Sequence, residues 1–306
     1  MNASTTLRAR LAMGRPLLLP GAPNALTARL LEDCGFEAIY VSGAGVANAF
    51  LGVPDIGLLT LTQLTDHVAA IRDAVSVPLV VDADAGFGNP IGVHRTVRLL
   101  ERAGASAIQI EDQVEPKRCG HFTDKAVISA QDMVQKVSAA VDARTDPDLR
   151  IIARTDAGGV TNFDEACDRA NSYLEAGADI AFVEAPRTRQ ELAEIPRRVR
   201  GPNVVNIVEG GLTPILPFDE LAGFGYSIVL YANSALRAAI SGMRTVMTHL
   251  HEVGDTNGIA DRFATWEERQ SLVRKEVFDA MSQRYATPVP ASTGSGIPTQ
   301  EGRTDG

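Results

Sequence analysis

The sequence predicts an α/β protein of the (β/α)8 TIM-barrel class with an extra helical segment after the barrel, and three observations carry this prediction. Eight short runs of β-branched and other apolar residues recur along the 306 residues, and apolar residues at helical spacing follow each run. No linker interrupts these repeats. Polar and acidic residues follow strand after strand, which is where a parallel barrel builds its site.

The apolar runs give the expected strands in chain order. They are Pro16–Pro20, Ala38–Ser42, Leu79–Asp82, Ala107–Glu111, Arg150–Arg154, Ile180–Glu184, Val204–Val208 and Ser227–Tyr231. Their interiors, such as Leu79-Val80-Val81, are continuously apolar, as in strands that are buried on both faces. Because periodicity alone does not prove closure, an open doubly wound sheet is the structural alternative.

Glycines and capping residues mark the expected helix boundaries. Four glycines shortly before strands have the position that ends a helix in the left-handed conformation: Gly35, Gly104, Gly177 and Gly225. Three pairs have the spacing of a capping box: Thr60 with Gln63, Ser129 with Asp132, and Thr188 with Glu191. These signals predict helices between the strands.

More helix follows the eighth strand than a barrel needs. The pattern predicts one helix over Ser234–Val253 and a second helical stretch over about Asp261–Arg284. We expect this extra segment to pack on a neighbouring subunit and to be swapped between subunits. Residues 1–286 are therefore expected to form a single catalytic domain, and residues 287–306, rich in Pro, Gly, Ser and Thr, a flexible tail.

Composition excludes several classes of function. With 45% hydrophobic and 22% charged residues the chain has ample material for a core, and its formal charge of −9 opposes binding to nucleic acid or to an anionic membrane. No apolar run approaches the ~18 residues of a membrane span, and no export signal is seen at the N-terminus. The three cysteines, at unrelated spacings, are expected to be reduced thiols of a cytoplasmic protein.

Three acidic residues at expected strand ends predict a metal site. Asp82 and Asp84 are two residues apart, so an extended backbone points both side chains to one face, where they repel each other. Mg²⁺ would relieve that repulsion, with Asp82, Asp84 and Glu111 as a mixed inner and outer shell. The alternative is that these acids cap helices or pair with Arg154.

Positive charge is placed at two further positions. Arg154 ends the fifth expected strand and is interpreted as a fork for a substrate carboxylate, with a plain salt bridge as the alternative. In the loop after the fourth strand, Lys117 and Arg118 precede Cys119, and His121 follows it by two residues. This setting favours a thiol that exchanges a proton, although an exposed basic turn with an incidental cysteine is the other interpretation.

The segment Lys117-Arg118-Cys119-Gly120-His121, with Asp82-Ala83-Asp84 and Glu111-Asp112-Gln113, resembles the isocitrate lyase and phosphoenolpyruvate mutase superfamily over roughly Leu17 to Arg284. The loop is similar to that of the carbon–carbon lyases, whose cysteine protonates the departing carbanion. The phosphonate-forming mutases have asparagine in that loop. The resemblance therefore implies a lyase in which Cys119 is the general acid, on a loop that closes over the substrate.

The same resemblance implies the contacts of substrate and metal. Around the 2-oxoacid half of the substrate it places Ser42, Gly43, Ala44 and Asp55. Around the remaining carboxylates it places Arg154, Glu184, Asn206 and Thr213. Gly120 is expected to bind substrate by letting the loop fold over it. Around Mg²⁺, with Mn²⁺ as the other possible ion, it places Asp82, Asp84 and Glu111. Ala44 stands where the family usually has a second glycine, a small departure because an alanine N–H still donates. The general base is Glu111, Asp55 or a water on the metal.

Substrate choice is implied by the segment after the seventh strand. Methylisocitrate lyases usually have Glu-Phe-Gly-Ala-Thr-Pro, whereas this chain has Glu209-Gly210-Gly211-Leu212-Thr213-Pro214, similar to 2,3-dimethylmalate lyases of the petal-death-protein type. We expect a 2-alkylmalate, with 2-methylisocitrate second, to be cleaved to a 2-oxoacid such as pyruvate plus a carboxylate. A homotetramer is also implied. The alternatives are an oxaloacetate decarboxylase or hydrolase, a phosphonate enzyme, and a non-enzymatic anion-binding barrel.

Overall fold

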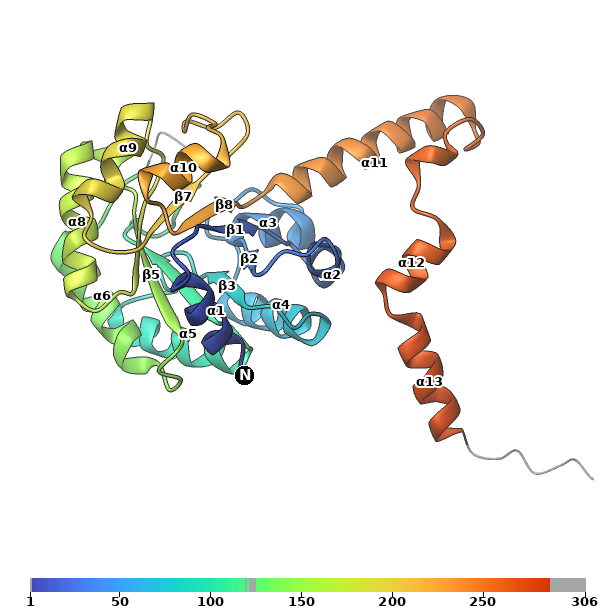
Figure 1. The fold of residues 1–306 in the computed structure, drawn as a ribbon, viewed down its shortest axis with the longest axis horizontal. Coiled ribbons are helices and arrows are strands. Elements are labelled where there is room, and N and C mark those ends of the chain that lie inside the picture. The colour runs from blue at the N-terminus through green and yellow to red at the C-terminus, as the bar shows by residue number, and fades with distance from the viewer. Residues whose placement is uncertain (1, 119, 121–124, 287–306) are drawn as a thin grey trace, which may run out of the picture. The chain divides into compact units, whose positions relative to one another are not determined.

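A computed structural model describes residues 2–118, 120 and 125–286, and it divides the chain into two compact units, Met1–Phe263 and Ala264–Gly306. The first unit contains a sheet of eight parallel strands surrounded by helices (Figure 1). The strands are β1 (Leu17–Pro20), β2 (Ile39–Val41), β3 (Leu79–Asp82), β4 (Ala107–Glu111), β5 (Arg150–Thr155), β6 (Ile180–Val183), β7 (Asn203–Asn206) and β8 (Ile228–Tyr231). The predicted TIM-barrel class and all eight strands are thus confirmed.

The ring of strands closes through a short seam. Strand β1 forms a full parallel ladder with β8. It meets β2 through the bridge between Gly21 and Tyr40, and the Ala22 N–H donates to the Tyr40 carbonyl at 2.8 Å. A Cβ on Gly21 would lie 1.8 Å from the carbonyl oxygen of Ala232, so only glycine allows this approach. The seam distinguishes the barrel from the open sheet.

The barrel interior is filled by side chains from alternate strand positions. They are mostly aliphatic and include Leu17, Leu19, Val80, Ile152 and Phe182, each at most 1% exposed. This packing makes the barrel a rigid support for residues at its rim.

Eleven α-helices of the first unit cover or follow the barrel among the described residues. They are α1 (Ala3–Leu11), α2 (Ala25–Asp33), α3 (Gly43–Val46), α4 (Leu61–Ala74), α5 (Pro90–Arg102), α6 (Ala130–Ala143), α7 (Ala157–Val160), α8 (Phe163–Glu175), α9 (Arg189–Arg198), α10 (Phe218–Phe224) and α11 (Ser234–Val253). Apolar faces of α2, α4, α5, α6 and α8 pack on the outer face of the sheet. A π-helical turn, Ala47–Leu51, follows α3 and was not predicted.

The predicted helix boundaries are largely confirmed. All four glycines adopt positive φ, between 87° and 105°. The box of Thr60 and Gln63 forms in both directions at the start of α4. At α6 and α9 the Ser129 and Thr188 side chains accept the expected backbone bond, but the acidic partner bonds elsewhere: Asp132 accepts from the Ser129 hydroxyl, and Glu191 from the Arg187 N–H. Those two boxes are half formed.

Two further helices belong to the second unit, α12 (Trp266–Leu272) and α13 (Lys275–Tyr285). The predicted stretch from Asp261 is therefore divided, and Arg274 between the two helices has φ 57°. Large apolar side chains are exposed on this unit, among them Trp266, Phe278 and Tyr285. The predicted tail, residues 287–306, lies outside the described residues. Within the described chain, no helix is both long and apolar enough to cross a membrane.

Candidate active site

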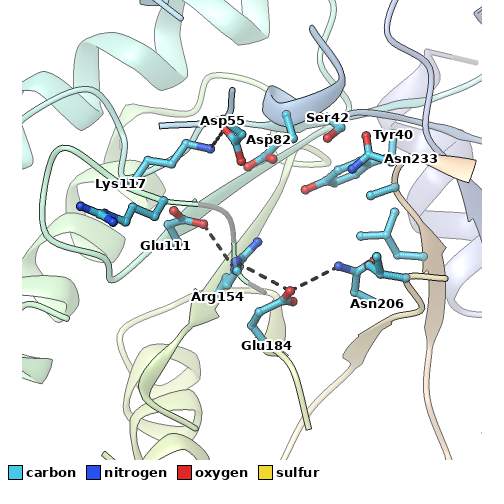
Figure 2. A pocket seen from close by; sticks show the side chains of 16 residues that line it. Tyr40, Ser42, Asp55, Asp82, Glu111, Lys117, Arg154, Glu184, Asn206 and Asn233 are labelled. Atoms are coloured by element: carbon cyan, nitrogen blue, oxygen red, sulfur yellow. Dashed lines mark hydrogen bonds and ion pairs between the residues drawn. The ribbon is translucent and has the colours of Figure 1, made fainter. Parts of the chain in front are cut away.

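A small, partly open cavity of about 60 Å³ lies where the strands end (Figure 2). Its lining comes from nearly every strand and the segments that follow them: Tyr40, Ser42, Ala44, Asp55, Asp82, Glu111, Lys117, Arg118, Gly120, Arg154, Glu184, Asn206, Val208, Leu230, Ala232 and Asn233. Parallel strands in a barrel bring their carboxyl ends to one rim, which is why residues so distant in sequence meet here.

Asp82, the last residue of β3, is held by three donors. Its Oδ2 accepts from the Gly43 N–H at 3.2 Å, and its Oδ1 accepts from the Gln109 side-chain amide at 3.0 Å and from the Asp84 N–H at 3.4 Å. The Tyr40 hydroxyl donates to the other end of the Gln109 amide at 3.0 Å. A buried chain of hydrogen bonds across β2, β3 and β4 therefore fixes the Asp82 carboxylate.

Asp84 and Asp55 share the ammonium of Lys117. Lys117 Nζ lies 2.7 Å from Asp84 Oδ1 and also pairs with Asp55. Burial lowers the pKa of Lys117, but the acids around it, first of all Asp84, raise it above its usual value. Burial raises the pKa of Asp84 to about 7, which Lys117 opposes. A Cβ at Gly43 would lie 2.8 Å from Asp84 Oδ1, so a larger residue where α3 begins would displace the Asp84 carboxylate.

Arg154 is the centre of a second cluster of charges. Its Nε lies 3.3 Å from Glu111 Oε2 and its Nη2 lies 3.9 Å from Glu184 Oε1, while the Asn206 amide donates to that Glu184 oxygen at 3.3 Å (Figure 2). Asp156 forms a two-bond fork with the same guanidinium. Burial lowers the pKa of Arg154, but these carboxylates together raise it above its usual value.

The acidic rim fits a divalent cation that takes part of its shell from water. Burial raises the pKa of Glu111 well above its usual range, although Arg154 opposes this, and Glu111 Oε1 is buried without a hydrogen-bond partner. Such an oxygen is suited to a hard cation. Within the described ranges no three His, Cys, Asp or Glu side chains are grouped closely enough to hold a metal ion together.

Most of the predicted site residues converge on this cavity. Eleven line it: Ser42, Ala44, Asp55, Asp82, Glu111, Lys117, Arg118, Gly120, Arg154, Glu184 and Asn206. Gly43 and Asp84 contact the lining residue Asp82. Thr213 is 3% exposed, its hydroxyl has no hydrogen-bond partner, and it is not part of the lining. Cys119 and His121 lie outside the described residues.

Sequence reasoning missed two residues that position the site, Tyr40 and Gln109. Both lie within strands and point into the barrel, where Gln109 is 1% and Tyr40 2% exposed. The signal available for Gln109 was a polar residue between two isoleucines in a strand that is otherwise apolar. A buried amide needs hydrogen-bond partners, and those of Gln109 are Tyr40 and Asp82.

The fold and the site define a barrel enzyme whose cavity holds two clusters of paired acidic and basic side chains. Residues 7–251 match the family model described as phosphoenolpyruvate phosphomutase. The chain belongs to this family, within the PEP mutase/isocitrate lyase superfamily.

Two named relatives are lyases. The chain is 41% identical over 287 residues to 2,3-dimethylmalate lyase of Eubacterium barkeri, which covers 94% of this chain and 99% of the relative. It is 47% identical over 257 residues to 2-methylisocitrate lyase of Aeropyrum pernix, with 84% and 82% covered. The chain is therefore an enzyme, and these relatives support a carbon–carbon lyase.

Solved structures agree with this family. A crystal structure of 2,3-dimethylmalate lyase superposes with a TM-score of 0.87 at 31% identity, over 97% of this chain and 99% of that one. Phosphonopyruvate hydrolase in complex with oxalate and Mg²⁺ superposes with a TM-score of 0.85 at 33% identity, over 93% and 99%. The fold therefore serves more than one reaction among its relatives.

Proposed function

We propose that this protein is a Mg²⁺-dependent lyase that cleaves a carbon–carbon bond in a small 2-hydroxy di- or tricarboxylate. The observation that carries the proposal is the pairing of two charge clusters in one cavity. Asp82, Asp84 and Glu111 form the acidic rim, and Arg154 with Lys117 supplies the positive charge. Such a substrate carries both a hydroxyl to be deprotonated and carboxylates to be held.

The acidic rim would hold the ion. Asp82 is oriented by its three donors, and Glu111 has a buried oxygen without a partner. When bound, Mg²⁺ supplies electrostatic stabilisation of the negative charge that develops at the substrate hydroxyl. The Mg²⁺ in the structure of phosphonopyruvate hydrolase supports this choice of ion, with Mn²⁺ as the other candidate.

The remaining side chains bind carboxylates and move protons. Arg154 offers its guanidinium to a substrate carboxylate, and Asn206 and Glu184 line the cavity beside it. Ser42 lies near Asp82 in Figure 2, and Ala44 also lines the cavity. Glu111 or Asp55 would remove the hydroxyl proton, with a water on the metal as the third possible base. Cys119 would return a proton to the carbon of the departing fragment, with His121 beside it in sequence.

A 2-alkylmalate is the first candidate substrate and 2-methylisocitrate the second. The match to 2,3-dimethylmalate lyase covers almost the whole of both chains. The lining also contains three aliphatic side chains from the ends of β7 and β8: Val208, Leu230 and Ala232. Aliphatic walls suit alkyl substituents better than a third carboxylate, because a buried charge needs a partner.

A substrate panel tests the proposal. The purified protein with Mg²⁺ is incubated with 2,3-dimethylmalate, citramalate, 2-methylisocitrate, isocitrate, oxaloacetate and phosphonopyruvate, and the released 2-oxoacid or oxalate is measured. We expect the highest kcat/KM for 2,3-dimethylmalate. Release of oxalate from oxaloacetate, or of phosphate from phosphonopyruvate, without cleavage of any 2-hydroxy acid would replace the lyase with a hydrolase. Full activity after exhaustive EDTA treatment would contradict the proposed dependence on Mg²⁺.

We also propose that residues 1–286 act as one catalytic domain of a cytoplasmic homotetramer. Exposed apolar residues on α11, namely Ile240, Met243, Met247 and Leu250, recur at helical spacing on one face. Exposed apolar residues also recur on α13. Apolar helical faces of this kind are suited to a second copy of the chain, including an exchange of helices between subunits.

A further inference from the structure

Lys125 has no part in the proposed reaction, yet its charge is buried beside the cavity. Its Nζ lies 2.6 Å from Asp156 Oδ1, and the two side chains are 2% and 0% exposed. The same ammonium donates to the carbonyl of Gly120, which lines the cavity. Burial of an ammonium costs solvation free energy that only well-placed partners offset, so this geometry is closely defined.

Asp156 joins Lys125 to Arg154. Arg154 Nε lies 2.9 Å from Asp156 Oδ2, and Arg154 Nη2 lies 3.1 Å from Asp156 Oδ1. One carboxylate oxygen therefore accepts from both cations. Burial raises the pKa of Asp156, but Arg154 and Lys125 bring it below its usual value, so the carboxylate stays ionised.

Asp156 is held from behind by Asp112, at the end of β4. The Asp156 N–H donates to Asp112 Oδ1 at 2.9 Å. Asp112 Oδ2 accepts from the hydroxyls of Thr155 and Tyr173, each at 2.7 Å. The position of the Asp156 backbone is thus set by the barrel, and its side chain is set by the two cations in front of it.

Gly120 contacts both Lys125 and Arg154. A Cβ on Gly120 would lie 2.2 Å from Arg154 Nη2 and 2.6 Å from Glu184 Oε1, so its backbone lies directly against both side chains. Lys125 therefore bonds two groups, Asp156 and Gly120, that each contact Arg154. On the other side of Gly120, the Gln113 amide bonds the backbone of Arg118 in both directions, at 2.8 and 2.9 Å.

We propose that Lys125 is a positioning residue that fixes the Arg154 guanidinium and the Gly120 peptide against each other through Asp156. The proposal rests on the proposed function in one respect, that Arg154 binds a substrate carboxylate. Without the ammonium, Asp156 keeps Arg154 as its one strong partner in this set. The guanidinium is then drawn toward Asp156, and Gly120 loses its bond to the loop residue that follows it.

The variant Lys125→Met tests this inference because methionine keeps the length of the side chain and removes its charge. We expect kcat/KM for the best panel substrate to fall about 10–100-fold, as for partners that orient a binding group. We expect the Kd for malate, measured by calorimetry, to rise about tenfold. Amide exchange of the peptide that spans Gly120 and Lys125 should become faster.

Chemical rescue of a truncated variant distinguishes a positioning role of Lys125 from a purely structural one. In Lys125→Ala, propylammonium restores the missing part of the side chain with its charge, and it should recover activity and malate binding. Propanol, of the same shape without the charge, should not. Arg144→Met is the matched control, since Arg144 pairs with Asp179 at 2.9 Å, and Asp179 lies before β6 at the other end of the barrel. It should lower Tm and leave kcat/KM and malate binding unchanged.

The two proposals fail in different ways. If wild-type protein binds malate but cleaves no 2-hydroxy acid, the proposed lyase activity is wrong. The malate Kd and the amide exchange of Lys125→Met still test the positioning role of Lys125 in that case. If Lys125→Met lowers only Tm, as Arg144→Met does, with unchanged malate Kd and unchanged exchange around Gly120, Lys125 merely neutralises Asp156 and the positioning role is overturned.

Discussion

At the scale of single residues, the site depends on carboxylates that are buried close to one another. Asp84 and Asp55 share one ammonium, that of Lys117, and the neighbouring Asp82 is held by N–H donors. Burial and mutual repulsion oppose ionisation of Asp84. A protein keeps such an arrangement when a ligand compensates for it, and this is why the acidic rim is interpreted as functional.

Asp84→Asn should reduce turnover by about 100-fold or more while the protein stays folded. The substitution removes a charge that burial penalises, so the melting temperature without Mg²⁺ should be unchanged or higher. Melting curves with and without MgCl₂ should show the ion-induced shift in wild type and in the control, but not in Asp84→Asn. Asp142→Asn, at an exposed position on α6, is the control. Wild-type turnover together with a wild-type Mg²⁺ shift would remove Asp84 from the site.

Cys119→Ser should reduce kcat by about 10²–10⁴-fold, the range typical of general acid catalysis, because a serine hydroxyl is a much weaker acid than a thiol. Malate affinity should change little, since serine is close to cysteine in size. Cys34→Ser, at the exposed end of α2, should retain full activity. If Cys119→Ser cleaves the panel substrates at the wild-type rate, Cys119 is not the general acid and the hydrolase alternative is favoured.

Cys167 should resist alkylation at mildly alkaline pH, in contrast to the exposed Cys34. It is 1% exposed, and burial raises its pKa to about 11. Since the folded pKa exceeds that of a free thiol, about 8.5, the contribution of Cys167 to stability is complete below pH 8.5 and is lost as pH rises toward 11. Peptide mass mapping after iodoacetamide treatment at pH 8 checks this, and equal labelling of both thiols without denaturant would contradict it.

At the scale of elements, the barrel seam makes the strictest demand on one residue. Gly21→Ala should destabilise the protein by about 1–3 kcal/mol, because its methyl group would overlap the Ala232 carbonyl. Gly223→Ala is a control for which we expect the opposite change in the free energy of unfolding. It lies in α10 with nothing within 4 Å of an added Cβ, and it should stabilise by about 0.4–1 kcal/mol. Urea unfolding at one protein concentration measures both, and equal effects would contradict the seam geometry.

The strands could be predicted because each is short, apolar and followed by polar residues, and a buried parallel sheet requires that pattern. The acidic rim followed from it, since strand ends meet at one edge. The π-helical turn Ala47–Leu51 and the break at Arg274 could not be predicted. Neither segment carries proline or another local signal, and both conformations depend on what the chain packs against.

The inward-pointing residues were also beyond local reasoning. Tyr40 and Gln109 meet through the register of β2, β3 and β4, which no single strand specifies. The pairing of Lys125 with Asp156 joins residues 31 apart through the turn that follows β4. Sequence patterns indicate which face of a strand is buried, whereas contacts of this kind depend on how neighbouring strands are staggered.

At the scale of the whole molecule, we predict a tetramer with four times the 32.6 kDa mass of one chain. Met243→Glu places a charge within the apolar face of α11 and should lower the mass measured by light scattering. Ser241→Glu, on the other side of the same helix, should leave it unchanged. A monomeric mass for wild type at micromolar concentration would end the prediction.

The pairing of β1 with β8 also has a consequence for synthesis on the ribosome. The first strand finds its ladder partner at Ile228–Tyr231, some 200 residues later in the chain. At about 5–20 residues per second, β1 waits on the order of 10–40 s before that partner is translated. During this interval its apolar residues Leu17 and Leu19, fully enclosed in the finished barrel, lack their final neighbours. We therefore expect chaperones that bind exposed apolar segments to hold the nascent chain until the last strand emerges.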